Sequence, residues 1–166
     1  MRKLGLTLAA LLAVPAVAMA QTATGSVNVN ATVQSAVSFG TATAANFGVV
    51  TPNVLATITP GAAGSGQIPL NYNQDVTVTA PTTVTLNHST AAASIVVTVA
   101  CAQDVTSTAA TPATFACNTG HSIAGVTTAG THYYYVGGSI PAAQTASAPA
   151  GSYTGALTFT ASFTAF

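Results

Sequence analysis

The chain has 166 residues, of which 49% are hydrophobic and only 2% are charged. Its two basic side chains are Arg2 and Lys3, and its two acidic ones are Asp75 and Asp104. A chain without Lys or Arg beyond its first residues has little to neutralise phosphate groups, so we expect no nucleic-acid binding and no attachment to charged lipid. The many apolar residues are unlike the composition of disordered chains and favour a folded domain.

Residues 1–20 have the pattern of a cleavable signal peptide. Two positive charges precede an apolar run over residues 4–17, and Ala18-Met19-Ala20 matches a small-x-small cleavage site. The run is shorter than the roughly 20 residues of a membrane-spanning helix, so the sequence favours a secreted protein that does not span a membrane. We expect the protein to pass through the periplasm to the cell surface or the exterior, with residues 21–166 as a single domain.

The remainder of the chain predicts strands. Apolar and polar residues alternate with period two, no long stretch has helical spacing, and Gly and Pro interrupt the pattern at short intervals. We expect strands over residues 27–33, 46–50, 54–58, 68–78, 84–86, 94–100, 132–140 and 153–163. Many short strands separated by turns are typical of an all-β sandwich with antiparallel sheets.

Cys101 and Cys117 are the only two cysteines. In an oxidising compartment an even number predicts a disulfide, with the stretch between them stapled as a surface loop or hairpin. A metal or redox pair is the alternative, but the chain has no C-x-x-C motif, and His121 is the only other ligand type nearby. We therefore expect a structural disulfide, with no metal and no cofactor.

Few side chains could perform catalysis. Asp75 and Asp104 are far apart in sequence, and the chain has no G-x-S-x-G nucleophile elbow. The histidines, His88, His121 and His132, are not clustered with them in sequence. We therefore do not expect an enzyme.

Two segments near opposite ends of the chain carry apolar stripes. Residues 22–34 place four apolar side chains at alternate positions: Val27, Val29, Ala31 and Val33. The expected last strand places another set on one face, with Thr and Ser on the other: Tyr153, Leu157, Phe159 and Phe163. A free terminus is normally polar and loose, so residues 22–34 are a candidate donor strand and the second set is its candidate acceptor groove.

Three stretches carry a resemblance to known proteins: NFGVV at residues 46–50, YVGGSIPA at 135–142 and PAGSYTGAL at 149–157. Together they resemble a bacterial secreted β-sandwich family of uncharacterised function, which is similar to the spore coat protein U and archaic chaperone-usher pilin families. The pilin branch implies an immunoglobulin-like antiparallel sandwich that lacks its final strand. In that scheme the N-terminal extension of the next subunit fills the groove.

The resemblance implies a structural subunit of a cell-surface filament or coat, such as a fimbria or pilus. Donor-strand exchange would join copies of the chain, helped by a periplasmic chaperone and an outer-membrane usher. A self-contained secreted or surface sandwich, whose N-terminal segment pairs within its own chain, is one alternative. A carbohydrate-binding module that uses Tyr133 to Tyr135 or the stapled loop is another, and it would need aromatic faces exposed in a row.

The position of the basic residues gives a test of the expected processing. Because neither Lys nor Arg follows Lys3, trypsin should leave the exported chain intact even when urea unfolds it. Chymotrypsin, which cleaves beside aromatic residues, is the control and should degrade it under the same conditions. A tryptic fragment detected by mass spectrometry would contradict the removal of residues 1–20.

Overall fold

A computed structural model describes residues 26, 28–32 and 34–164. The expected signal peptide, residues 1–20, lies outside the described residues, as do Val27 and Val33 of the candidate donor strand. The chain divides into two units, Met1–Val33 and Gln34–Phe166. Residues 28–32 of the first unit are exposed and form no strand, so the strand expected there is absent from the single chain.

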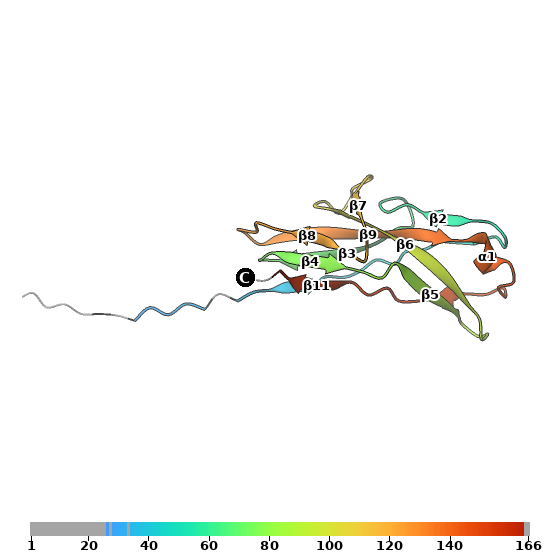
Figure 1. Cartoon of the computed structure of the whole chain (residues 1–166), viewed down its shortest axis with the longest axis horizontal. Coiled ribbons are helices and arrows are strands. Elements are labelled where there is room, and N and C mark those ends of the chain that lie inside the picture. The colour runs from blue at the N-terminus through green and yellow to red at the C-terminus, as the bar shows by residue number, and fades with distance from the viewer. Residues whose placement is uncertain (1–25, 27, 33, 165–166) are drawn as a thin grey trace, which may run out of the picture. The chain divides into compact units, whose positions relative to one another are not determined.

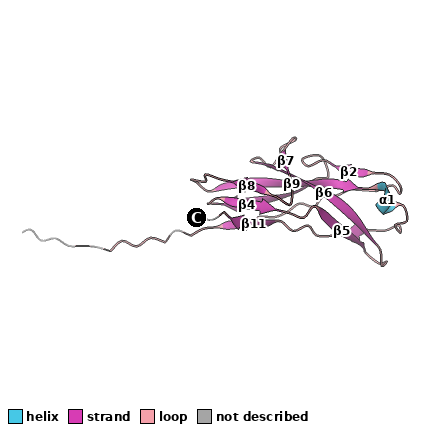
Figure 2. Cartoon of the chain, in the orientation of Figure 1, coloured by secondary structure: helices cyan, strands magenta, loops and turns pink. Residues whose placement is uncertain are grey.

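The second unit is built from strands (Figure 2), and 42% of the described residues are in strands against 3% in helix. The elements are β1 (Val37–Phe39), β2 (Ala56–Ile58), β3 (Gly66–Tyr72), β4 (Val76–Thr79), β5 (Thr83–His88), β6 (Ser94–Asp104), β7 (Ala113–Phe115), β8 (His121–Ile123), β9 (Gly130–Ile140), α1 (Ala142–Thr145), β10 (Tyr153–Thr154) and β11 (Thr160–Phe163). The single turn of α1 is far too short to cross a membrane, and the described part of the chain holds no helix that could.

The strands form two antiparallel sheets, which confirms the expected sandwich-like all-β fold. The larger sheet has the order β1-β3-β9-β6-β5-β10, with β2 also paired to β9 and β7 to β6. The smaller sheet has the order β11-β4-β8. In Figure 1, β4, β8 and β11 lie toward one end of this unit, and α1, β2 and β5 lie toward the other. Strand β9 runs between the two ends, since Tyr72 lies opposite Gly130 at its start and Ala56 opposite Ile140 at its finish.

The core lies between the sheets. One cluster of buried side chains comes from both sheets: Leu70, Val76, Val78, Ile123 and Tyr134. The expected disulfide is confirmed, because Cys101 in β6 is bonded to Cys117 with their Cα atoms 5.5 Å apart. The Ala80 N–H, just after β4, donates to the Cys117 carbonyl at 2.9 Å. The bridged segment therefore ties the larger sheet to the end of a strand of the smaller one.

One expected strand is wrong in extent, and another is absent. The stretch 68–78 divides into β3 and β4, which belong to different sheets, because its middle turns back on the start of the unit. There the Asn73 N–H donates to the Ala36 carbonyl and the Ser35 hydroxyl donates to Gln74. Residues 46–50 form no strand at all, because the Asn46 side chain accepts from the Gly48 N–H and thereby stabilises a local turn.

The expected last strand is also interrupted, although its phase is correct. Thr154 lies opposite Asn87, and Thr160 lies opposite Thr79. The segment from Thr154 to Thr160 is shorter than the segment from Thr79 to Asn87, and the two segments do not pair. Residues 155–159 thus cross from the larger sheet, where β10 pairs with β5, to the smaller one, where β11 pairs with β4. The inward residues remain half-buried and the intervening Thr and Ser residues remain exposed through the crossing.

The disulfide predicts a defined loss of stability on reduction. Reducing it should lower the free energy of unfolding by about 3 kcal/mol, because the loop that it closes no longer restricts the unfolded chain. Urea unfolding with and without dithiothreitol measures the difference. The Cys101→Ala/Cys117→Ala variant is the control, since the reductant should not change its unfolding midpoint. An equal response of both proteins would contradict the assignment of the stability change to this bond.

Candidate functional site

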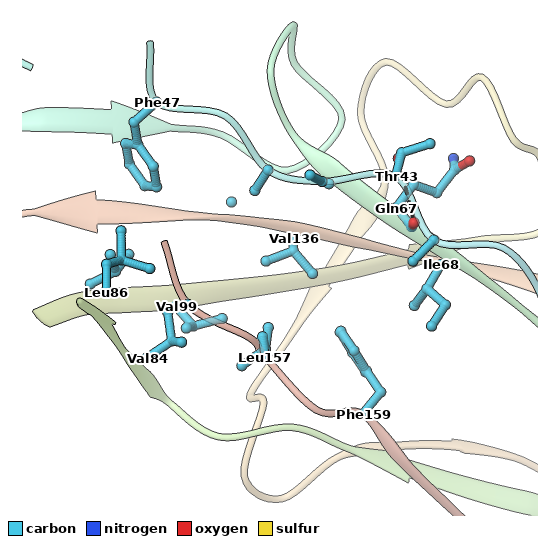
Figure 3. Close-up of a pocket in the computed structure, with 17 residues that line it drawn as sticks. Thr43, Phe47, Gln67, Ile68, Val84, Leu86, Val99, Val136, Leu157 and Phe159 are labelled. Carbon is cyan, nitrogen blue, oxygen red and sulfur yellow. Dashed lines mark hydrogen bonds between the residues drawn. The ribbon is translucent and has the colours of Figure 1, made fainter. Parts of the chain in front are cut away.

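An apolar groove separates two segments at the edge of the sandwich. Residues 42–47 form one wall and residues 155–159 the other, and the two segments are not paired with each other. The first wall is held to β3 by an isolated antiparallel bridge between Thr43 and Gln67. Figure 3 shows Phe47 projecting from the first wall and Leu157 and Phe159 from the second. The floor between them comes from β5, β6 and β9, with Val84, Leu86, Val99 and Val136 directed into the space.

The groove is one continuous surface made of two hollows. The first has a volume of about 340 Å³ and the second about 630 Å³. They share lining residues: Ala44, Ala45, Phe47, Leu86 and Gly155. Thr43 and Gln67 are the only polar residues that line the first hollow, and no charged residue lines either one. The first hollow therefore fits an apolar occupant, whereas polar residues line part of the second: Asn46, Thr145, Ser152 and Thr154.

Three of the four residues of the candidate acceptor groove line these hollows, and their role as an acceptor stays a prediction. Leu157 and Phe159 line the first hollow, Tyr153 lines the second, and Phe163 lies on β11 outside the lining of both. The opposite wall was not found, because residues 42–45 are three alanines and a threonine without an apolar alternation. The order of the floor strands in the sheet was likewise not readable from the sequence.

The second wall continues into a free strand edge. Within the described residues, β11 has a sheet neighbour on one side only, because it pairs with β4 and is the first strand in its sheet. An edge strand presents backbone N–H and C=O groups that a further strand can pair with. The wall of the groove ends at Phe159, and β11 with its backbone edge begins at the next residue. Apolar side-chain contacts and backbone groups of an edge are what strand addition uses.

The described residues of the candidate donor segment carry their apolar side chains into solvent. Val29 is 87% exposed, and Ala31 is exposed as well. The neighbouring Asn28, Asn30 and Thr32 are also exposed. Val29 and Ala31 alternate with these polar residues, so their apolar surface lies on one side of the segment, where a groove could bury it.

The acidic side chains have local structural roles. The Asp75 carboxylate accepts from the N–H groups of Val126 and Gly125 at 2.8 and 3.0 Å, and these bonds lower its pKa. Asp104 accepts from the hydroxyl and the N–H of Thr106, which lower its pKa in the same way. Among the described residues, no group of three or more His, Cys, Asp or Glu side chains could hold a metal ion.

The tyrosines of β9 pack inside the fold. Tyr134 is fully buried between the sheets, and Tyr135 is buried with its hydroxyl donating to the Thr106 carbonyl at 2.6 Å. Tyr133 is only half-buried. An exposed row of aromatic faces over residues 133–135 is therefore absent, which removes the surface that a sugar ring would need there.

A histidine-tyrosine cluster connects the two sheets away from the groove. The Nδ1 atoms of His121 in β8 and His132 in β9 lie 3.1 Å from the hydroxyls of Tyr134 and Tyr72, respectively. The centroids of the two imidazoles are 5.6 Å apart. Burial lowers the pKa of both histidines below 6.5, and each is affected by a neighbour: His132 lowers the pKa of His121, whereas Asp104 partly raises that of His132.

This cluster predicts a loss of stability in acid. Because the pKa of both histidines is lower in the folded chain, the unfolded chain binds more protons as the pH falls below about 6.5. These two groups should therefore leave the free energy of unfolding unchanged above that pH. As the pH decreases further, they should lower it. Urea titrations from pH 8 to pH 5 measure the effect.

Two variants identify the groups responsible. In His121→Gln/His132→Gln the decrease between pH 7 and pH 5 should be smaller, because neither side chain takes up a proton. Tyr72→Phe removes one hydrogen bond but keeps both imidazoles, so it should lower stability at every pH and retain the decrease. An unchanged acid profile in the double variant would contradict the role of the cluster.

The comparisons with known proteins add no relative to this description. No family model matches the chain, and no curated protein matches it significantly. The groove, the free edge of β11 and the exposed Val29 are therefore the observations from which a function can be argued.

Proposed function

We propose that the protein is a structural subunit of a cell-surface filament or coat, and that residues 22–34 of one copy fill the groove of another. The observation that carries this proposal is the apolar groove beside the unpaired edge of β11. A strand placed there would hydrogen-bond to that edge and bury alternate side chains against the floor. The exposed stripe at Val29 and Ala31 has the spacing for such contacts.

The lengths of the two segments agree. At about 3.3 Å per residue, extended residues 22–34 would span about 40 Å and residues 153–163 about 35 Å. Each valine moved from solvent into the groove would contribute about 1.5 kcal/mol or more. The apolar stripe therefore supplies a driving force of several kcal/mol, which the backbone hydrogen bonds would increase.

The composition of the chain supports association between copies. Beyond Lys3 its only ionisable acids are Asp75 and Asp104, so little charge repulsion opposes contact between subunits. The Cys101–Cys117 disulfide is compatible with an oxidising compartment outside the cytoplasm. We propose that the chain is exported and that a periplasmic chaperone shields the groove before an outer-membrane usher assembles the subunits, as the resemblance to pilins implies. This role requires no catalysis and no cofactor.

A charge placed on the apolar stripe tests the exchange. Val29→Asp should prevent assembly of the exported chain, because an unpaired carboxylate would enter an apolar groove. Asn30→Asp introduces the same charge on the opposite face of the strand and is the matched control, which should still assemble. Both proteins should unfold at the same urea concentration as monomers, since Val29 is exposed in the single chain.

Deletion of the segment separates exchange from pairing within one chain. A chain without residues 22–34 should form a soluble one-to-one complex with a peptide of those residues, as measured by size-exclusion chromatography with light scattering. A full-length protein that stays monomeric and ignores the peptide would contradict the filament proposal. In that case, a loss of monomer stability in Val29→Asp would identify residues 22–34 as the first strand of a self-contained sandwich.

A further inference from the structure

An unusual amount of apolar surface is concentrated in one loop. Residues 46–55, here named the end loop, include three exposed large hydrophobic residues: Val49, Val54 and Leu55. Val49 is 100% exposed and Leu55 is 59% exposed. Single exposed hydrophobic residues are ordinary, but three in one short loop form a patch of the kind found at interaction sites.

Hydrogen bonds hold the end loop in position. The Asn53 N–H donates to the Thr145 hydroxyl of α1 at 3.1 Å, and the Val54 N–H donates to the Thr51 carbonyl at 3.2 Å. Together with the turn at Asn46, these contacts fix the loop at both ends. Its apolar side chains are therefore presented by an ordered backbone, and little entropy would be lost when a partner covers them.

The end loop lies where the groove opens. Val49, Val50 and Pro52 line the second hollow together with residues of the loop after α1. The opposite end of this unit holds Gln34, to which the donor segment is joined. There the Asn73 side-chain amide donates to the Gln34 carbonyl at 2.9 Å, in the turn between β3 and β4.

The direction of the donor strand decides which end of the next copy meets the end loop. Every strand pair in the described chain is antiparallel, and an antiparallel strand also suits the free edge of β11. Because the acceptor segment runs from Tyr153 near α1 to Phe163 near the β3–β4 turn, an antiparallel donor leaves the groove beside Tyr153. Its own Gln34 then emerges next to the end loop.

We propose that the end loop is a docking surface for a second copy of this chain, and that it contacts the β3–β4 turn of the subunit whose segment fills the groove. This inference rests on the proposed strand exchange. An ion pair cannot join the two surfaces, since the end loop has no charged residue, and the Asp75 carboxylate at the turn already accepts from the N–H groups of Gly125 and Val126. The contact therefore depends on burial of Val49, Val54 and Leu55.

Two binding measurements separate this contact from filling of the groove. Val54→Asn/Leu55→Asn alters the end loop without touching the lining of either hollow. The first measurement titrates a labelled peptide of residues 21–34 into the exported Val29→Asp chain, with and without these two changes. The second measures assembly of the exported chain by analytical ultracentrifugation, again with and without them. Val105→Asn, at a valine that is 65% exposed in the loop between β6 and β7, is the control.

The proposal gives a different result in each measurement. The double variant should bind the peptide within twofold of the parent and should need about tenfold more protein to assemble, because Val54 and Leu55 lie outside the groove and only subunit association buries them. Val105→Asn should match the parent in both. Unchanged assembly of the double variant would overturn the docking surface and leave strand exchange intact. Weaker peptide binding by the double variant would also overturn the docking surface, because it would show that Val54 and Leu55 contact the strand in the groove. Absence of peptide binding and assembly in the parent proteins would overturn both proposals.

Discussion

The crossing of residues 155–159 from one sheet to the other is the constraint on which the rest of the structure depends. These residues pair with neither β4 nor β5, because the segment that joins β10 to β11 is shorter than the segment opposite it, between Thr79 and Asn87. Gly155 lies at the start of the crossing, where a Cβ atom would collide with the Thr85 carbonyl oxygen. Only glycine fits that close approach, so this position allows the chain to leave β10 and reach β11.

The crossing also connects the groove to the core. Leu157 and Phe159 point inward from it and pack against the cluster that contains Cys101 and Cys117. The same two side chains form a wall of the first hollow. The same row of residues therefore closes the core on one side and is left half-buried on the other, where the groove lies.

Sequence periodicity predicted the faces of strands better than their partners. The phase of residues 153–163 is correct because the inward and outward side chains differ strongly in character. The break at residues 155–159 was not predictable, since it depends on the register against β4 and β5. Short strands such as β1, β7 and β8 carry too few residues for a pattern. The wall at residues 42–45 was not predicted for a related reason, because its small side chains line the groove only through what lies opposite them.

The scarcity of charge links the fold to the proposed assembly. Most small domains use charged side chains to remain soluble and to keep exposed strand edges from pairing. Beyond Lys3, this chain has only Asp75 and Asp104, and each is already engaged by nearby N–H or O–H groups. No lysine guards the free edge of β11, and no charge lines the groove beside it. In a protein that works as a monomer, such an edge would be a hazard. In a subunit that receives a strand from its neighbour, a charged side chain at this edge would have to be buried each time a copy was added. The lack of such a charge therefore favours assembly.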